Sequence, residues 1–304
     1  MAQDITLKLP SGINAPTQDD INAAKEYVLE RSRAEIALAS AVDDILKEYA
    51  EQMIRVCYKY NIDPQNFSFG ANDIMRQEIY AILDDLLEEL LSLIEEDSVP
   101  QNRKNKHYGA IISWLATLGT HNKDLKWTTQ YYISRFSKDV EALVAAMKYA
   151  GYDVNKAVNR SKSILHTLYT SPEVLAAMKS GKMFNAEGII SGGTKYDPFT
   201  HKPSVGLSKY GATNLVTMAR STLAKTWMKS EFMEAEDEGM GGYYVFRGSS
   251  YPCSHICDLE CGWFHPMSMG MVCPLHSSCQ CWVLYVKSDK GEITNYRNLN
   301  PYML

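Results

Sequence analysis

Cysteine and histidine side chains gather in one stretch near the C-terminus, from Cys253 to Cys281, with the sequence CSHICDLECGWFHPMSMGMVCPLHSSCQC. It holds six of the seven cysteines and three of the seven histidines of the chain. Thiolate and imidazole groups are the usual ligands of tetrahedral zinc, and two ligand groups separated by a loop are typical of small zinc-binding modules. Closely spaced cysteines are also typical of small disulfide frameworks. The stretch therefore predicts either a zinc site or a disulfide-linked loop.

The candidate zinc ligands lie in one group before the loop and one group after it: Cys253, Cys257, His276, Cys279 and Cys281. Because a structural zinc ion takes four ligands, one of the last two cysteines is in excess, and the sequence leaves open which of them binds. The other side chains of this kind are candidates for additional thiols or for groups that support the ligands: Cys261, Cys273, His255 and His265.

The redox state of the cellular compartment affects whether the cysteines bind a metal or form disulfides. The N-terminal residues MAQDITLKLPSG lack the apolar core of a signal peptide, and no apolar run is long enough to span a membrane. We expect a soluble protein made in a reducing cytoplasm, where thiols favour metal over disulfides. A particle that later leaves the cell would let the same thiols oxidise, so both chemistries stay open.

A catalytic metal centre is the competing interpretation of the stretch. A zinc deaminase needs His-x-Glu or Cys-x-Glu upstream of Pro-Cys-x-x-Cys, but here three residues separate Cys253 from Cys257 and no such element precedes them. The surplus of ligands predicts a closed shell, whereas catalytic zinc needs an open position for water. Asp258, Glu260 and His265 are the acid–base candidates of the alternative function, a metal-dependent hydrolase or nuclease. We expect a structural site and no enzyme.

The residues on either side of the stretch are typical of β-strands. Tyr243 to Phe246 precede it and Trp282 to Val286 follow it, and both runs are rich in aromatic and β-branched residues. A helix from Thr213 to about Glu236 leads into the first run. We expect the two strands to pair and to form, with this helix, a small unit whose core is too thin to be stable without a metal or disulfide staple.

Most of the chain before residue 180 has helical periodicity, with apolar residues at the spacing of amphipathic helices. Asp63-Pro64 and Ser171-Pro172 mark helix ends, and Gly151 suits a left-handed C-cap. Cys57 lies in an apolar helical pattern, which predicts a core position. The predicted helices cover about residues 17–60, 72–97, 107–118, 126–150, 154–169 and 213–236. The predicted fold class is α+β and predominantly α-helical, with a helical body followed by the small C-terminal unit.

The charge pattern favours no nucleic-acid or acid–base site outside the Cys/His stretch. The net charge is −5 and the isoelectric point is near 5.8, which gives no overall attraction to nucleic acid. We interpret two short basic runs, residues 103–107 and 156–162, as surface. The second predicted helix has an apolar row and, opposite it, carboxylates that we interpret as a solvated face: Asp84, Asp85, Glu88, Glu89, Glu95 and Glu96.

Glycine and proline are concentrated between Gly181 and Gly211, which predicts a long loop or arm. With it, the chain divides into five predicted parts. They are an extended N-terminal arm (1–16), a helical body (17–182), the Gly/Pro-rich loop or arm (183–211), a Cys/His-rich domain (212–287) and a C-terminal tail (288–304).

The order of motifs in the Cys/His-rich domain resembles the phage Mu F-like family, the head-morphogenesis or minor head proteins of tailed phages. The matching pieces are Arg220-Ser221-Thr222, the strand from Tyr243 to Phe246, Cys253, Cys257, Gly262, the run from Pro274 to Cys281 and the strand from Trp282 to Val286. They cover roughly residues 205–287. Thr222 stands where the family usually has an acidic residue, and Gln280 where it commonly has a basic one, so no family role is carried over to these two positions.

The resemblance implies a minor capsid protein that takes part in virion assembly, inside the capsid or at the portal vertex. The structural zinc site is predicted from the Cys/His residues themselves. Portal and capsid proteins are the implied partners, and packaged DNA is a further candidate. The resemblance implies neither a membrane partner nor a small-molecule substrate.

Overall fold

The computed structural model describes residues 18–99, 106–119, 123–180, 210–246, 260, 264–272, 274, 281–287 and 296–297. The predicted N-terminal arm lies outside these residues. So do nearly all of the 183–211 loop and most of the Cys/His stretch and of the C-terminal tail.

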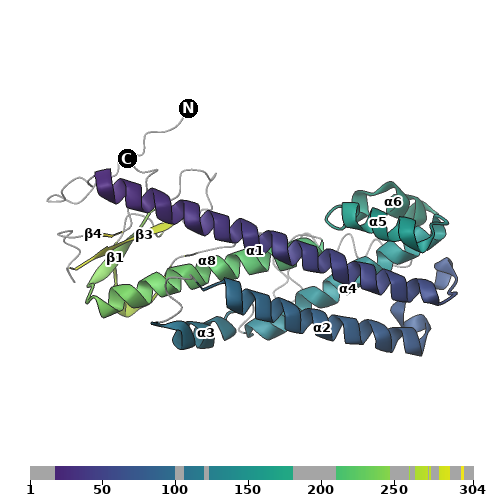
Figure 1. The fold of residues 1–304 in the computed structure, drawn as a ribbon, viewed down its shortest axis with the longest axis horizontal. Coiled ribbons are helices and arrows are strands. Elements are labelled where there is room, and N and C mark those ends of the chain that lie inside the picture. The colour runs from purple at the N-terminus through teal and green to yellow at the C-terminus, as the bar shows by residue number, and fades with distance from the viewer. Residues whose placement is uncertain are drawn as a thin grey trace. The chain divides into compact units, whose positions relative to one another are not determined.

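The described chain is predominantly helical and contains one small antiparallel sheet (Figure 1). The helices are α1 (Gln18–Lys59), α2 (Asp73–Asp97), α3 (Tyr108–Ala116), α4 (Leu125–Tyr149), α5 (Val154–Ile164), α6 (Pro172–Lys179) and α8 (Gly211–Asp237). The strands are β1 (Gly242–Phe246), β2 (Phe264–Pro266), β3 (Trp282–Val286) and β4 (Tyr296–Arg297). The predicted class, predominantly α-helical with a small β-sheet, is confirmed for these residues. The predicted metal-binding loop of the C-terminal unit lies mostly outside them.

The helix ends follow from local side chains. Asp153 precedes α5, and its carboxylate accepts a hydrogen bond from the backbone N–H of Lys156, as an N-cap residue does. Gly151 follows α4 with a φ of 73°, the left-handed conformation predicted for it, and Gly239 follows α8 with a φ of 69°.

The prediction for residues 154–180 is wrong in two respects. The helix predicted to reach residue 169 ends at Ile164, and a short 3-10 helix, Leu168–Thr170, follows. The break predicted at Ser171-Pro172 is instead the start of α6. Proline is tolerated in the first helical position, where its missing N–H would have no intrahelical partner, and Ser171 caps this helix by accepting from Val174 N–H.

The described residues form two compact units that do not follow chain order. Unit 1 comprises those within Met1–Leu38, Glu96–Ser113 and Arg220–Leu304. Unit 2 comprises those within Ala39–Glu95 and Trp114–Ala219. The long helices α1 and α8 each contribute residues to both units.

The core of unit 2 contains the apolar row predicted for α2. Four residues of the row are completely buried: Ile79, Leu86, Leu90 and Ile94. The carboxylates opposite the row are exposed except that of Glu95, which is half-buried, so the predicted solvated face is confirmed. Cys57 is also completely buried in this core, as predicted, and burial raises the pKa of its thiol to about 12.

Gly211, the first residue of α8, lies against the backbone of α4. A Cβ atom added to Gly211 would lie 2.3 Å from the backbone nitrogen of Phe136 and 2.6 Å from its Cα atom. Backbone atoms of a helix cannot move aside as a flexible side chain can, so only glycine fits at this approach.

We predict that Gly211→Ala destabilises unit 2 by about 1–3 kcal/mol, the usual cost of overpacking. A Gly-to-Ala change in an unhindered helix stabilises instead, so the sign of the effect reports the close approach. Gly109→Ala is the matched control, because Gly109 lies in α3 with no atom within 4 Å of the added Cβ. Urea denaturation followed by circular dichroism measures both changes. Equal or greater stability of the Gly211→Ala protein would contradict the prediction.

In unit 1 the four strands lie in the order β2-β1-β3-β4, and each neighbouring pair is antiparallel. The predicted pairing of the two long strands is confirmed, with Gly242 opposite Val286 and Phe246 opposite Trp282. β2 and β4 were not predicted, because segments of three and two residues carry no detectable alternation of side chains.

The helix α8 differs from the amphipathic helix predicted for its sequence. Within its unit 1 part, four polar residues are also buried, namely Thr222, Thr226, Ser230 and Glu231. Met228 and Phe232 of the same part pack against Tyr243, Val245 and Tyr285 of the sheet. A helix buried on several sides needs no strong amphipathic pattern.

Candidate functional site

Two of the nine predicted site residues, His265 and Cys281, lie within the described residues. The other seven lie outside them: Cys253, Cys257, Cys261, Cys273, His255, His276 and Cys279. Within the ranges that the structure describes, no group of three or more His, Cys, Asp or Glu side chains is arranged to hold a metal ion.

The strand register brings together the two strand ends that flank the Cys/His stretch. The chain leaves β1 at Phe246 and enters β3 at Trp282, and these two residues are partners in the antiparallel pair. The chain therefore leaves β1 and enters β3 at the same end of the sheet. A zinc ion or a disulfide within the stretch would close a loop whose two ends are already held by strand pairing.

Tyr243 in β1 is the centre of the described polar contacts beside this stretch. Its hydroxyl donates a hydrogen bond to the carbonyl oxygen of Gly270, at 2.5 Å, and accepts one from the backbone N–H of Val272, at 3.1 Å. The hydroxyl thus fixes the chain that follows β2. The ring of Tyr243 is itself packed edge-on against Phe232 of α8, with ring centroids 6.1 Å apart.

His265 in β2 is a packed residue. It is 4% exposed, and its ring stacks on that of Tyr243 at a centroid distance of 5.2 Å. Nε2 lies 3.1 Å from the carbonyl oxygen of Glu260 and 3.8 Å from a carboxylate oxygen of the same residue. Since a carbonyl oxygen can only accept, Nε2 carries the proton, and Nδ1 is the nitrogen whose lone pair a metal could use.

Cys281 is also buried, at 3% exposure, immediately before β3. Its side chain belongs to a hydrophobic cluster with Met228, Phe232 and Tyr243. Cys281 therefore joins the core of the C-terminal sheet to the segment that carries the other candidate ligands.

A buried ion-pair network lies between α1 and α8 in unit 1. Glu35 lies 3.2 Å from Nε of Arg31 and 3.3 Å from a terminal nitrogen of Arg220. Arg31 and Glu35 are 1% and 4% exposed, and Nε of Arg220 is buried with no hydrogen-bond partner among the described residues. Sequence analysis missed this network, although Arg31 and Glu35 have the i, i+4 spacing of a helical ion pair.

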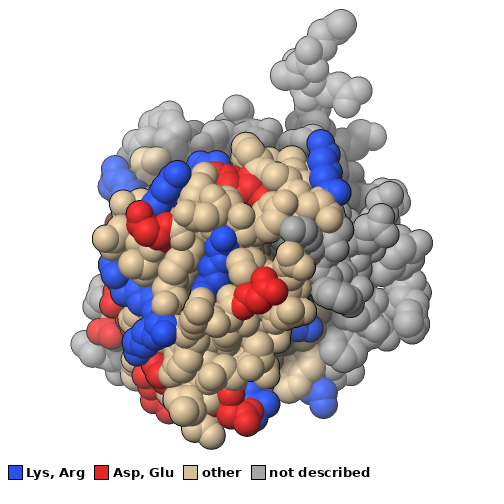
Figure 2. Space-filling view, turned by 90° about the vertical axis from the view of Figure 1, so that its right-hand side faces the viewer, with Lys and Arg blue, Asp and Glu red and all other residues tan. Residues whose placement is uncertain are grey.

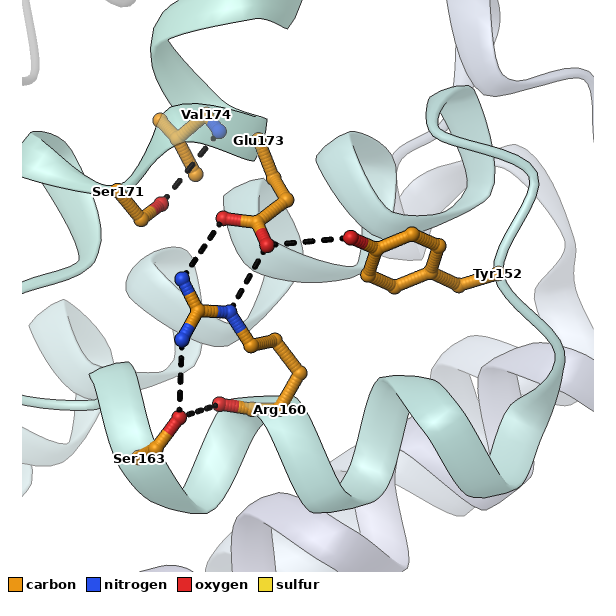
Figure 3. Close-up of polar contacts among 6 residues, drawn as sticks. All are labelled: Tyr152, Arg160, Ser163, Ser171, Glu173 and Val174. Atoms are coloured by element: carbon orange, nitrogen blue, oxygen red, sulfur yellow. Dashed lines mark hydrogen bonds and ion pairs between the residues drawn. The ribbon is translucent and has the colours of Figure 1, made fainter.

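The predicted basic run on α5 is held by contacts inside unit 2. Arg160 makes two hydrogen bonds to the carboxylate of Glu173, at 2.8 and 3.2 Å, and Tyr152 donates to the same carboxylate (Figure 3). Lys156 lies over the ring of Tyr152 at 3.8 Å, and Lys162 pairs with Glu51 at 2.7 Å. These cations are engaged with the protein itself.

Charges of both signs share the surface at this end of unit 2. On the side that carries α5 and α6, Lys and Arg side chains are interspersed with Asp and Glu side chains (Figure 2).

The described residues of the other basic run lie in unit 1. Lys106 pairs with Asp237 at 2.6 Å, and His107 lies 3.0 Å from the same carboxylate. The contacts of these described residues agree with their interpretation as ordinary surface.

A hydroxyl, an imidazole and a carboxylate also meet in unit 2. His166 has Nε2 2.6 Å from Asp43 in α1 and Nδ1 2.9 Å from the hydroxyl of Thr213 in α8. The second carboxylate oxygen of Asp43 pairs with Lys47 at 2.6 Å. Burial raises the pKa of Asp43, but the hydrogen bonds and charge interactions with Lys47 and His166 together outweigh it, so the pKa is lowered. The array links α1, the turn after α5 and the first turn of α8.

The chain was compared with protein-family models, curated proteins and solved structures. No protein-family model, curated protein or solved structure matches it. None of the described helices is long and apolar enough to cross a membrane.

Proposed function

We propose that this chain is a minor head protein of a tailed phage or prophage, a structural component assembled at the portal or on the inner capsid. The proposal rests on the ordered motifs from Arg220 to Val286 that resemble the Mu F-like family. The pairing of Phe246 with Trp282 supports it, because a stapled loop between two paired strands is the arrangement that those motifs require.

We further propose that the Cys/His stretch holds a structural zinc ion. Cys253, Cys257 and His276, with Cys279 or Cys281, supply thiolate and imidazole ligands in sufficient number for a closed tetrahedral shell. The described core around Tyr243 is small, and a metal in the adjacent loop would add the stability that such a core lacks. In a closed shell the metal has no position for a catalytic water, so its role is to hold the loop.

Purified particles test the virion assignment. Heads from a lysate of cells that carry the phage are treated with nuclease, banded on a density gradient and analysed by mass spectrometry. We expect the chain to band with the heads in far fewer copies than the major capsid protein. Its presence in the soluble lysate and absence from the heads would refute the assignment.

Element-resolved mass spectrometry of the protein purified without added reductant tests the zinc site separately. We expect about one zinc ion per chain, the stoichiometry of a single tetrahedral site. A metal-free protein whose thiols are blocked against alkylation until reduced would identify the disulfide alternative instead.

A further inference from the structure

The carboxyl group of Asp139 joins three elements in the interior of unit 2. Asp139 lies on α4 and is 4% exposed. One of its oxygens accepts a hydrogen bond from the Tyr169 hydroxyl at 2.6 Å, and the other accepts one from the backbone N–H of Gly211, also at 2.6 Å. The carboxyl group thus holds the 3-10 helix Leu168–Thr170 and the first residue of α8 to α4.

The first turn of α8 is held at this point by two further contacts. Gly211 approaches the backbone of Phe136 so closely that no Cβ atom fits between them. Tyr210, the residue before the helix, stacks on Tyr169 at a centroid distance of 5.8 Å and an interplanar angle of 14°. Any separation of the first turn from α4 must therefore break the contacts of Asp139 and open its carboxyl group to water.

We propose that Asp139 is a protonation-sensitive anchor, which holds the first turn of α8 to α4 more firmly when its carboxyl group is neutral than when it is ionised. Both hydrogen bonds exist in either form. In the neutral acid, the carbonyl oxygen still accepts from Gly211, and the acid proton is donated to the Tyr169 hydroxyl, which turns to accept it. Ionisation adds the cost of a charge removed from water, and opening of the anchor relieves that cost.

The groups around the carboxyl set the pH at which the anchor changes. Three groups favour the ionised form of Asp139: the Tyr169 hydroxyl of the 3-10 helix, the Gly211 amide of α8 and Arg135, one turn earlier in α4. Burial raises the pKa of Tyr169, and the neighbouring Tyr210 raises it further. Burial of Asp139 outweighs these three groups and raises its pKa to about 6. In the opened state the pKa returns towards the ordinary value of an aspartate. The anchoring is therefore strongest below that ordinary value and weakens as the pH rises through about 6.

Hydrogen exchange of the full-length protein tests the proposal. Exchange rates of the Gly211 and Asn214 amides, corrected for the intrinsic pH dependence, report how often the first turn opens. From the raised pKa, we expect the opening to become about tenfold more frequent between pH 5 and pH 8. Asp139→Asn keeps the shape and both hydrogen bonds but cannot ionise in this range, so its corrected rates should be independent of pH.

Two further variants separate a specific anchor from a general effect of pH. Tyr169→Phe removes a hydrogen bond that favours the ionised form, so the midpoint of the change should move to higher pH. Asp153→Asn, which alters the cap of α5, should leave the profile of the wild-type protein unchanged. The proposal is wrong if wild type and Asp139→Asn give the same pH dependence, or if protection of these amides increases with pH.

Discussion

Replacing Cys257 or His276 with alanine is expected to unfold the C-terminal sheet. A structural zinc site contributes roughly 10 kcal/mol or more of folding free energy in small modules, because the site does not exist in the unfolded chain. Loss of one ligand removes most of this contribution. The described core of the sheet, centred on Tyr243 and Tyr285, is too small to replace it. We expect a large fall in melting temperature and rapid proteolysis after residue 246.

Differential scanning fluorimetry and limited proteolysis measure these effects, with His121→Ala as a control, because His121 lies outside the Cys/His stretch. A chelator should reproduce the loss if zinc is the staple, whereas a reductant should do so if disulfides are. A variant that keeps its stability and loses a hydrolytic or nuclease activity would instead support the catalytic alternative.

Glu35→Ala is expected to destabilise unit 1 by about 3–5 kcal/mol, the usual cost of removing one partner from a buried ion pair. Arg31 is almost completely buried, and the variant removes the carboxylate that lies 3.2 Å from its guanidinium in the interior. The variant also removes the partner that Arg220 has on α1. The ion pair within α1 and the ion pair between α1 and α8 are therefore lost together.

The midpoint of urea denaturation measures this effect, with Glu30→Ala as the matched control. Glu30 is an exposed residue of the same helix, and such surface changes usually alter stability by less than about 0.5 kcal/mol. Glu35→Gln should fall between the two, because the amide keeps the shape and an acceptor but no charge. If Glu35→Ala is as stable as Glu30→Ala, the network contributes nothing to the fold.

The helices and the paired strands could be predicted because their signals are local. Apolar residues recur at helical spacing along α2, Gly151 adopts the left-handed conformation at a helix end, and two runs of β-prone residues flank the Cys/His stretch. The break at Ser171-Pro172 was misread for a related reason. Proline ends one helix and begins another with equal ease, and the choice depends on whether the next residues find a surface to pack against.

The candidate metal ligands are a property of composition and spacing, and they were identified from the chain alone. The buried polar groups were not. Glu35 meets Arg220, and Asp139 meets Gly211, across long separations in sequence, so no local pattern distinguishes these acidic residues from those on the exposed face of α2. Burial depends on which helices pack together, and packing is a property of the whole fold.

Amino-acid order alone therefore indicates most of the helices, the two long strands that flank the Cys/His stretch and the side chains that could bind zinc. Folding determines which charges leave water. A carboxylate has the same intrinsic chemistry at Glu88 and at Asp139, but one is hydrated and the other is enclosed by Tyr169 and the first turn of α8. The energetic cost of that enclosure arises only when distant elements come together, so it exists only in the folded protein.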